Sequence, residues 1–596
     1  MKSSTLYSRY LLLIAGLGGL LYGIDVGIIA GALPYLETTS GYTQSQLSTV
    51  VAAVLLGSVL SSLFAGMLAD FFGRKPIMIF SALLFVASIP VICLSNSIGM
   101  LVAGRLLQGV SAGLIGVVVP LYLAECLSAK TRGKGTGIFQ FLLTVGLVAA
   151  ALIGLYYANH VESVENAAGV TAETVRAVKD SAWRGIFWAS ILPGALFFAG
   201  AFFVTESPRW LFRRGKKDAA LLALEKSNGA QAARDTLAEM EQAETQARAS
   251  TATQKVRDTL LRRKYVIPFL IAIVILACNQ ATGINSVLAY SVNIFNQGGL
   301  VGKIGNNANV LLTVVNCLMT VVAVTLVDRK GRKFLLKMGT AGIIIALVCA
   351  GLLFRSIETS RFDVKPAVAQ MAATTAAANT LTIDLADPAA RAALRANLKG
   401  ACESDTQVFV TYSYGAYRNV AFASSALKDK VLRIAPPKAG DLQDSVIGAF
   451  FRKLHLNPFT DTAGSERAPL VIEKAVFGAQ PSAATGWLVA VCFVVFIAAF
   501  ASGPGVCVWL ALSELMPTRI RSNGMSIALL INQFVSTTIA AVFLPVVGAV
   551  GYSTMFFVWA GFTVIYFCTA AFVMPETKGR TLEEIEEHFE GKRKLA

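Results

Sequence analysis

The chain has 596 residues, of which 55% are hydrophobic and only 15% are charged, against about 25% charged in an ordinary soluble protein. This composition excludes a string of soluble domains and favours a protein built into a lipid bilayer. The net charge of +16 would indicate a nucleic-acid partner in a soluble protein. We expect no nucleic acid here, because the basic residues gather in short connections between apolar runs.

Apolar runs long enough to cross a bilayer, about 20 residues each, recur along the chain. The first run is too long for the apolar part of a signal peptide and another follows it directly, so we expect it to remain as a span. The sequence predicts an all-α membrane protein with twelve transmembrane helices. They lie at roughly 9–33, 47–70, 75–96, 99–125, 135–158, 183–204, 265–295, 307–327, 336–354, 485–511, 523–547 and 553–574.

Basic residues occupy alternate connections between these runs. Because lysine and arginine are enriched in cytoplasmic loops, we expect both termini and the central connection on the cytoplasmic side of a multi-pass protein of the cell (inner) membrane. The basic positions are Arg74 and Lys75, Lys130 with Arg132 and Lys134, Arg329 to Lys333, Arg519 and Arg521, and Lys578 and Arg580.

Three short motifs occur twice, in the same order. The repeated pairs are Asp70–Lys75 with Asp328–Lys333, Glu125 and Arg132 with Glu514 and Arg521, and Glu206–Arg209 with Glu576–Arg580. The spacings agree once a polar stretch at 355–484 is removed. Duplicated halves are a known transporter plan with the binding site near the membrane midplane. The predicted parts are two six-helix halves, 1–204 and 265–574, a linker at 205–264, the insertion 355–484 and a tail at 575–596.

The segments outside the membrane are less informative. The linker alternates apolar and charged residues and predicts short amphipathic helices. The insertion follows the ninth span, so we expect it outside the cell. Its alanine-rich part, about 367–398, predicts helix, and the remainder carries Gly, Pro and Asp turn signals.

Asp25 lies inside the first predicted span. An ionised carboxylate at that depth costs about 2.5–3.5 kcal/mol on insertion scales, so it needs a partner, a proton or a function. Arg105 in the fourth span is the natural partner. The three histidines, His160, His455 and His588, fall outside the predicted spans. If protons drive transport, Asp25 must carry them; the alternative is a permanent ion pair that locks two helices.

Neutral polar side chains inside spans form a second set: Gln140, Gln280, Asn285, Asn316 and Asn532, with Trp509. Amides offer both donors and acceptors for the hydroxyls of a sugar, and an indole offers a flat apolar face. On a straight helix Gln280 and Asn285 would point about 140° apart, but Gly283 permits a break that brings both to one cavity. The alternative for each amide is a hydrogen bond between helices.

Charged residues at the predicted cytoplasmic helix ends form a third set: Asp70, Arg74, Glu125, Arg132, Asp328, Arg332, Glu514 and Arg521. Ion pairs there would hold the halves together when the cavity faces outward and part when it opens inward, which makes them a predicted gate. The alternative is orientation by positive charge alone. Gly503-Pro504-Gly505 favours a hinge in the tenth span, whereas Gly23, Gly27 and Pro34 fit either flexibility or close packing.

Several classes of activity are excluded. The sequence has no phosphate-binding Gly-x-x-x-x-Gly-Lys-Ser/Thr stretch, so the chain alone is not an ATP-driven pump. Nothing resembles a nucleophile elbow or a paired catalytic carboxylate, so we expect no enzyme. Cysteine and histidine spacings are unlike those of metal sites, so we expect no metal or other cofactor.

The motifs together resemble the sugar porter family of the major facilitator superfamily. They are Gly66–Lys75, Gly104-Arg105, Pro120–Glu125, Arg132-Gly133, Glu206–Leu211, Gln280–Asn285, Gly503–Gly505 and Pro575–Leu582. The resemblance covers nearly the whole chain except 355–484. It implies that Asp25 stands where proton-coupled symporters have an aspartate and facilitative relatives a neutral residue. It also implies that the amides and Trp509 contact sugar, with Asn279 and Tyr22 at the periphery.

Three positions depart from the family pattern. Ala289 replaces a common tyrosine, Leu147 replaces a second glutamine of the xylose symporters, and Ser502 stands near a tryptophan of some symporters. Leu147 and the Gly503–Gly505 segment look more like glucose facilitators. The sugar is thereby left between a hexose and a pentose.

The reading that follows is a monomeric symporter that imports a monosaccharide, such as glucose or xylose, with a proton by alternating access. A uniporter in which Asp25 is only structural is the second hypothesis. A transporter-like sugar sensor that signals through the insertion or the linker is the third, and the short tail counts against it.

Overall fold

The computed structural model describes residues 2–127, 129–253, 262–374, 379–395, 405–425, 430–437, 464–517, 521–578 and 582–590. Within them, 12 helical segments are long and apolar enough to cross a membrane. The prediction of an all-α membrane protein with twelve spans is therefore confirmed.

The first six spans form the N-terminal half and the last six the C-terminal half. The N-terminal spans are α1 (Lys2–Ser40), α2 (Gln44–Phe72), α3 (Arg74–Cys93), α4 (Ile98–Cys126), α5 (Ala129–Glu165) and the pair α6 (Ala172–Trp188) with α7 (Ile191–Ala201). The C-terminal spans are α11 (Arg263–Ala281) with α12 (Ile284–Gly298), α13 (Lys303–Lys330), α14 (Arg332–Thr359), α18 (Ala483–Ser502) with α19 (Pro504–Leu515), α20 (Arg521–Val550), and α21 (Tyr552–Cys568), which continues as a π-helical segment, Thr569–Val573.

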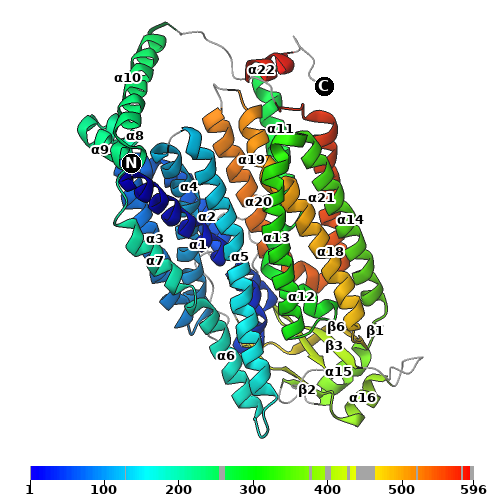
Figure 1. Cartoon of the computed structure of the whole chain (residues 1–596). Coiled ribbons are helices and arrows are strands. Elements are labelled where there is room, and N and C mark those ends of the chain that lie inside the picture. The colour runs from blue at the N-terminus through cyan, green and yellow to red at the C-terminus, as the bar shows by residue number, and fades with distance from the viewer. Residues whose placement is uncertain are drawn as a thin grey trace.

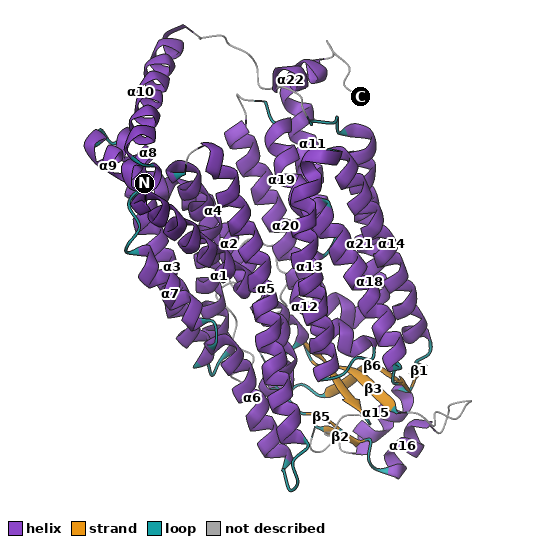
Figure 2. Ribbon diagram, viewed as in Figure 1, coloured by secondary structure: helices purple, strands orange, loops and turns teal. Residues whose placement is uncertain are grey.

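The two halves lie side by side and meet along three helix pairs, α1 with α12, α2 with α20 and α5 with α13 (Figure 1). Both termini lie at one end of the bundle, which we call the termini face. The linker helices α8 (Pro208–Arg213), α9 (Lys217–Asn228) and α10 (Ala230–Thr253) and the final helix α22 (Leu582–Glu590) lie there too. All strands lie at the opposite end, the sheet face (Figure 2).

Close packing between α1 and α5 explains two of the glycines in the first span. A Cβ atom on Gly23 would lie 1.9 Å from the carbonyl oxygen of Leu143, and one on Gly27 would lie 3.0 Å from the Cβ of Ala150. The helix α1 runs unbroken past both glycines and past Pro34. Of flexibility and close packing, the structure therefore shows close packing at Gly23 and Gly27.

The fifth and sixth spans are longer than the apolar runs indicate. Helix α5 continues to Glu165, and α6 begins at Ala172 because the Thr171 hydroxyl accepts a hydrogen bond from the Thr174 N–H at 3.2 Å and caps its first turn. The expectation that all histidines lie outside the spans is wrong for His160, which lies on α5. Its side chain is exposed near the sheet face, far from Asp25 along the bundle.

The insertion folds into a small α/β domain at the sheet face. Its elements are β1 (Phe362–Asp363), α15 (Lys365–Thr374), β2 (Leu381–Asp384), α16 (Pro388–Arg395), β3 (Thr406–Tyr414), β4 (Tyr417–Ser424), β5 (Val431–Ile434), a 3-10 turn (Ser465–Arg467) and β6 (Leu470–Ala479). One antiparallel sheet has the order β1-β6-β3-β4, and β2 pairs with β5. Side chains such as Val408, Val410 and Phe477 give the domain its own core.

The strands of this domain correct the sequence-based reading of the insertion. The alanine-rich part, expected to be helical over about 367–398, forms two short helices separated by the strand β2. The predicted boundary also shifts, because α14 extends five residues beyond 354, to Thr359. Residues 381–384 form a strand because they pair with β5. Local composition does not predict such a long-range pairing.

Candidate functional site

Asp25 and Arg105 meet in the interior of the N-terminal half. Asp25 projects from α1 and Arg105 from α4, and the Arg105 Nη1 atom lies 3.6 Å from the Asp25 Oδ1 atom. Both side chains are fully buried, with exposed fractions of 0% and 1%. The same Nη1 atom donates a hydrogen bond to Gln108 Oε1 at 2.6 Å, and the guanidinium lies 5.3 Å from the centre of the Phe187 ring. The structure thus brings together the pair predicted from the sequence.

Hydrogen bonding around this pair is incomplete. Among the described residues, neither carboxylate oxygen of Asp25 has a donor, and Arg105 Nε and Gln108 Nε2 have no acceptor. A buried polar group without a partner costs about 1–3 kcal/mol, and a charged one costs more. A permanent structural ion pair would ordinarily be closer and better satisfied. Both oxygens of the Asp25 carboxyl group therefore remain available for a proton or another hydrogen-bond donor.

Three predicted sugar contacts form one hydrogen-bonded cluster in the C-terminal half. Asn285 Nδ2 donates to Gln280 Oε1 at 3.0 Å, and Gln280 Nε2 donates to Asn532 Oδ1 at 3.3 Å. Asn532 Nδ2 in turn donates to the carbonyl oxygen of Leu276 at 3.0 Å. Asn285 also donates to Ser536 Oγ at 2.7 Å. The amide cluster, Gln280, Asn285, Asn532 and Ser536, joins α11, α12 and α20.

Gly283 makes this cluster possible by separating α11 from α12. It has a φ of +84°, in the left-handed region that favours glycine. The space is also too small for a side chain, because a Cβ atom would lie 2.4 Å from the ring of Trp559. The predicted break between Gln280 and Asn285 is confirmed, and it lets two residues of one span hydrogen bond to each other.

The tenth span is interrupted in the same way. Helix α18 ends at Ser502 and α19 begins at Pro504, with Gly503 in a non-helical conformation, φ −129° and ψ −91°. A Cβ atom on Gly503 would lie 2.4 Å from the carbonyl oxygen of Leu335. The break at the predicted position is therefore observed, and its use as a hinge stays a prediction.

Gln140 and Asn316 lie where α5 and α13 meet across the two halves. The neighbouring Thr144 hydroxyl contacts Cys317 Sγ at 3.4 Å. Residues four apart share one helix face, so Gln140 faces the same junction as Thr144. Asn316 is 8% exposed. These two amides line the boundary between the halves without joining the amide cluster.

The remaining predicted contacts are placed individually. Asn279 is buried on α11, and its side-chain oxygen has no donor among the described residues. The ring of Tyr22, on α1, packs beside Gly116 of α4. Trp509 lies on α19, and its side chain is outside the described part of the chain.

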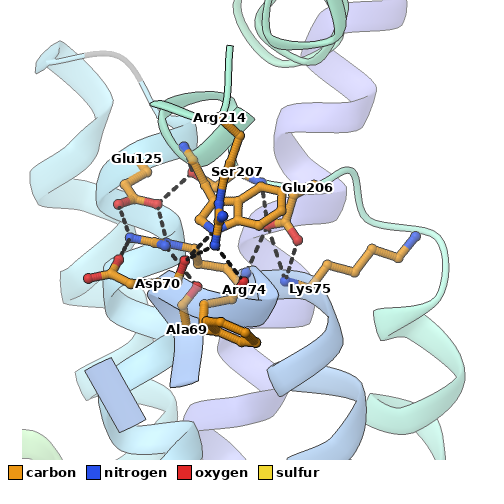
Figure 3. A network of polar contacts seen from close by, with 10 residues as sticks. Ala69, Asp70, Arg74, Lys75, Glu125, Glu206, Ser207 and Arg214 are labelled. Carbon is orange, nitrogen blue, oxygen red and sulfur yellow. Dashed lines mark hydrogen bonds and ion pairs between the residues drawn. The ribbon is translucent and has the colours of Figure 1, made fainter. Parts of the chain in front are cut away.

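A polar network holds the termini-face ends of α2, α3 and α4 together (Figure 3). The guanidinium of Arg74 binds both carboxylate oxygens of Glu125, at 2.8 and 2.9 Å, and also lies 2.8 Å from Asp70 Oδ1. Its third nitrogen donates to the carbonyl oxygen of Ala69 at 2.9 Å. The Ser207 hydroxyl completes the site by donating to Glu125 Oε2 at 2.5 Å. Nearly every donor of this buried arginine is satisfied.

Glu206 binds the beginning of α3 in the same network. Its carboxylate accepts the backbone N–H of Arg74 at 2.9 Å and that of Lys75 at 3.3 Å. A negative charge at a helix N-terminus is favoured by the unpaired N–H groups and the helix dipole. Burial raises the pKa of the Glu206 carboxyl group, and the N–H groups of Ser207, Arg74 and Lys75 oppose that rise.

The C-terminal half carries a second copy of this arrangement. Arg332 Nη2 lies 3.0 Å from Glu514 Oε1. Glu576 accepts the backbone N–H of Arg332 at 3.2 Å and that of Lys333 at 3.1 Å. Glu206 and Glu576 were not among the predicted gate residues, although the repeat of their motifs after the sixth and twelfth spans was the signal that could have found them.

The ion pairs of Arg74 and Arg332 at this face each join helices of one half. The pairs of Arg74 stay within the N-terminal half and that of Arg332 within the C-terminal half. The side chains of Arg132, Asp328 and Arg521 lie outside the described part of the chain. A gate that joins the two halves through this third set therefore stays a prediction.

The polar contacts found between described residues of opposite halves lie from the middle of the bundle to the sheet face. Tyr290 on α12 donates to Ser48 Oγ on α2 at 3.4 Å, and Ser48 Oγ also accepts the Leu544 N–H at 3.3 Å. Lys303 and Glu162 form an ion pair at 3.5 Å. These contacts close the bundle at the sheet face.

A sequence profile of the family described as "Sugar (and other) transporter" matches residues 11–381 and 469–589. The chain belongs to the sugar porter family of the major facilitator superfamily. The unmatched stretch, 382–468, falls within the inserted domain. This sugar porter is a multi-pass membrane transporter and not an enzyme.

Individual relatives and a solved structure agree with this assignment. The arabinose-proton symporter of Bacillus subtilis is 30% identical over 340 residues, covering 57% of this chain and 70% of that protein. The glucose transporter GlcP of Staphylococcus epidermidis is 30% identical over 355 residues, covering 59% and 73%. The xylose transporter XylE from E. coli, in a partially occluded inward-open conformation, superimposes with a TM-score of 0.63 and 20% identity over 96% of this chain and 99% of that chain; this likeness shows a shared fold.

Replacing Gly283 should damage the amide cluster of this sugar porter. Gly283→Ala adds a methyl group against Trp559 and places a non-glycine residue at positive φ, which together should destabilise the protein by about 1–3 kcal/mol. Thermal unfolding and equilibrium binding of labelled sugars in detergent would measure the loss. Gly298→Ala on α12 is the control, because its added methyl would meet Val489 at an ordinary 3.4 Å. Equal behaviour of the two variants would contradict the role given to Gly283.

The two copies of the charge network should differ in their contribution to stability. The Arg74–Glu125 pair has exposed side-chain fractions of 2% and 7%, whereas Arg332 and Glu514 have 11% and 27%. Glu125→Gln should lower the free energy of unfolding by as much as ~3 kcal/mol, since it leaves a buried charge with a weaker partner. The matched variant Glu514→Gln should cost clearly less. Chemical or thermal unfolding of both variants would test this, and a larger loss for Glu514→Gln would refute it.

Proposed function

We propose that this sugar porter carries a monosaccharide into the cell together with a proton, by alternating access. The observation that carries the proposal is the incomplete hydrogen bonding of the buried Asp25 carboxyl group. It lies 3.6 Å from Arg105 inside the N-terminal half, and among the described residues no donor reaches either oxygen.

Proton coupling rests on the energy of that carboxyl group. An ionised carboxylate in a membrane interior is costly, and its usual compensation is a set of hydrogen-bond donors. Asp25 has a long ion pair instead, so binding a proton removes an incompletely compensated charge, and releasing it restores the attraction to Arg105. Gln108 and the Phe187 ring hold the guanidinium in either state. Asp25 is thereby suited to gain and lose a proton during each cycle.

The proposed cargo is a neutral sugar. The amide cluster presents uncharged donors and acceptors in the C-terminal half. Gln140 and Asn316 add two further amides on α5 and α13, which pack against each other across the halves. Such groups match the hydroxyls of a sugar in both hydrogen-bonding senses. The relatives named for arabinose and glucose transport support a monosaccharide, and both a pentose and a hexose fit.

The proposed orientation has the termini face in the cytoplasm. Arg74 and Lys75 begin α3, and Arg332 and Lys333 begin α14, next to the short connections at that face, as the positive-inside rule requires. The sheet face, with the inserted domain, is then external. The contacts of Tyr290 with Ser48 and of Lys303 with Glu162 close the external side in this conformation.

The proposed cycle divides the work between the halves. Asp25 and Arg105 belong to the N-terminal half, and the amide cluster belongs to the C-terminal half. The two halves rock about α1–α12, α2–α20 and α5–α13, so that sugar and proton are exposed first to one side and then to the other. The charge networks of Arg74 and Arg332 keep each half rigid during this motion.

Uniport is the second candidate. The ion pair of Asp25 with Arg105 is formed in the structure, and a pair that never parts would hold α1 against α4 without moving protons. In that case sugar flux would be independent of a proton gradient.

The Asp25→Asn variant in proteoliposomes separates these two functions. In the wild-type protein we expect an imposed proton gradient to drive uphill uptake of a labelled sugar. Asp25→Asn should abolish uphill uptake and retain sugar counterflow, because the neutral side chain cannot release a proton. Asp218→Asn, the same chemical change at an exposed position on α9, is the control and should behave as wild type.

The outcomes decide between the candidates. Uphill uptake that persists in Asp25→Asn would refute the proposed role of Asp25. Counterflow without any uphill uptake in the wild-type protein, across a panel of pentoses and hexoses, would establish uniport instead.

A further inference from the structure

A chain of polar contacts at the sheet face links the two halves of the bundle through Glu37. This residue lies near the end of α1, and its two carboxylate oxygens accept hydrogen bonds from different partners. Asn293 Nδ2 on α12, in the C-terminal half, donates to Oε2 at 3.0 Å. Gln44 Nε2, in the first turn of α2, donates to Oε1 at 2.8 Å. Glu37 therefore connects α1 and α2 to the opposite half.

The same contacts continue into the inserted domain. The backbone N–H of Gln44 donates to Asn419 Oδ1 on β4 at 3.4 Å. Asn419 is held within its sheet, because its Oδ1 also accepts the Val420 N–H at 2.9 Å and its Nδ2 donates to the Tyr412 hydroxyl at 3.4 Å. The domain thus contacts the N-terminal half through a side chain of defined position.

The neighbouring residue on β4 contacts the C-terminal half. A Cβ atom on Gly548, near the end of α20, would lie 3.4 Å from Val420 Cγ2, so the Val420 side chain packs against this helix. One strand therefore bridges α2 and α20, one of the three helix pairs through which the two halves meet.

The attachment of the domain makes this bridge sensitive to the transport cycle. The chain enters the domain from α14 and leaves it into α18, and both helices belong to the C-terminal half. The domain must travel with that half. When the sheet face opens, α1 and α2 separate from α12 and α20, and the contacts of Glu37 with Asn293 and of Gln44 with Asn419 must break together.

We propose that the inserted domain is part of a clasp that holds the outer gate of this transporter closed. The domain contributes the hydrogen bond of Asn419 on β4 with Gln44, and α1 and α12 contribute the adjoining Glu37–Asn293 hydrogen bond. The clasp favours the conformation closed at the sheet face and is released each time the transporter opens there. This inference rests on the proposed alternating-access function, and it assigns the insertion a role in setting how often the transporter opens.

Two variants weaken the clasp in different ways. Asn419→Ala removes the acceptor on β4. Gln44→Pro removes the N–H donor and the side chain that binds Glu37, at the first position of α2, where proline is well tolerated. The preceding Thr43 already has the extended conformation that a following proline requires, φ −67° and ψ 160°. The control is Arg418→Ala, on the same strand, which breaks an exposed ion pair with Glu473 inside the domain.

Amide hydrogen exchange of the full-length protein in lipid nanodiscs would test the clasp. The segment to follow is the last two turns of α12, which include Asn293 and which none of the variants alters. We expect its exchange to accelerate about three- to tenfold in Asn419→Ala and in Gln44→Pro, and to remain at the wild-type rate in Arg418→Ala. Unchanged exchange in both clasp variants, or equal acceleration in the control, would overturn the proposal.

This measurement is independent of cargo and of proton coupling. Faster exchange in a protein that shows no symport would support the clasp and refute only the proposed function. Symport together with unaltered exchange in the clasp variants would support the proposed function and refute the clasp.

Discussion

A carboxyl group buried in an apolar bundle is the constraint around which the rest of this transporter is arranged. Asp25 has one cation, Arg105, at 3.6 Å, and the described residues supply no hydrogen bond to its oxygens. A carboxylate so placed carries a charge that its surroundings compensate incompletely. The same guanidinium is supported from other directions by Gln108 and Phe187, so its position does not depend on the ion pair with Asp25 alone.

The halves of the bundle hold different chemistry. The ionisable pair is built from α1 and α4, whereas the amide cluster is built from α11, α12 and α20. In the proposed symport, coupling between proton and sugar would depend on the surface where the halves meet, since no described hydrogen bond joins Asp25 to the amides. Two contacts join the halves there, Thr144 with Cys317 and Tyr290 with Ser48. Through such contacts, binding in one half would change the conformation of the other.

The sequence predicted the helices of the two halves and several of the contacts between them. The twelve spans, the pairing of Asp25 with Arg105, the clustering of Gln280 with Asn285 and the breaks at Gly283 and Gly503 follow from apolar length, buried charge and glycine placement. Ser536, Gln108 and Glu37 were missed, because one serine, glutamine or glutamate carries no signal of its partner until the helices are packed. The strands β1, β2, β5 and β6 were missed because their pairing joins segments far apart in the chain, and the alanine-rich sequence around β2 favours helix. The hairpin of β3 and β4 is local and was missed as well.

The inserted domain is attached to the bundle through two chain segments that lie side by side. The first strand of the domain pairs antiparallel with the last, Phe362 opposite Phe477, so the incoming and outgoing chains run together as a narrow stalk. The helices on either side, α14 and α18, pack directly against each other. A domain attached through such a stalk can be deleted or replaced by a short turn while α14 and α18 keep their packing. The junction is therefore a suitable site for fusing another soluble domain to the transporter.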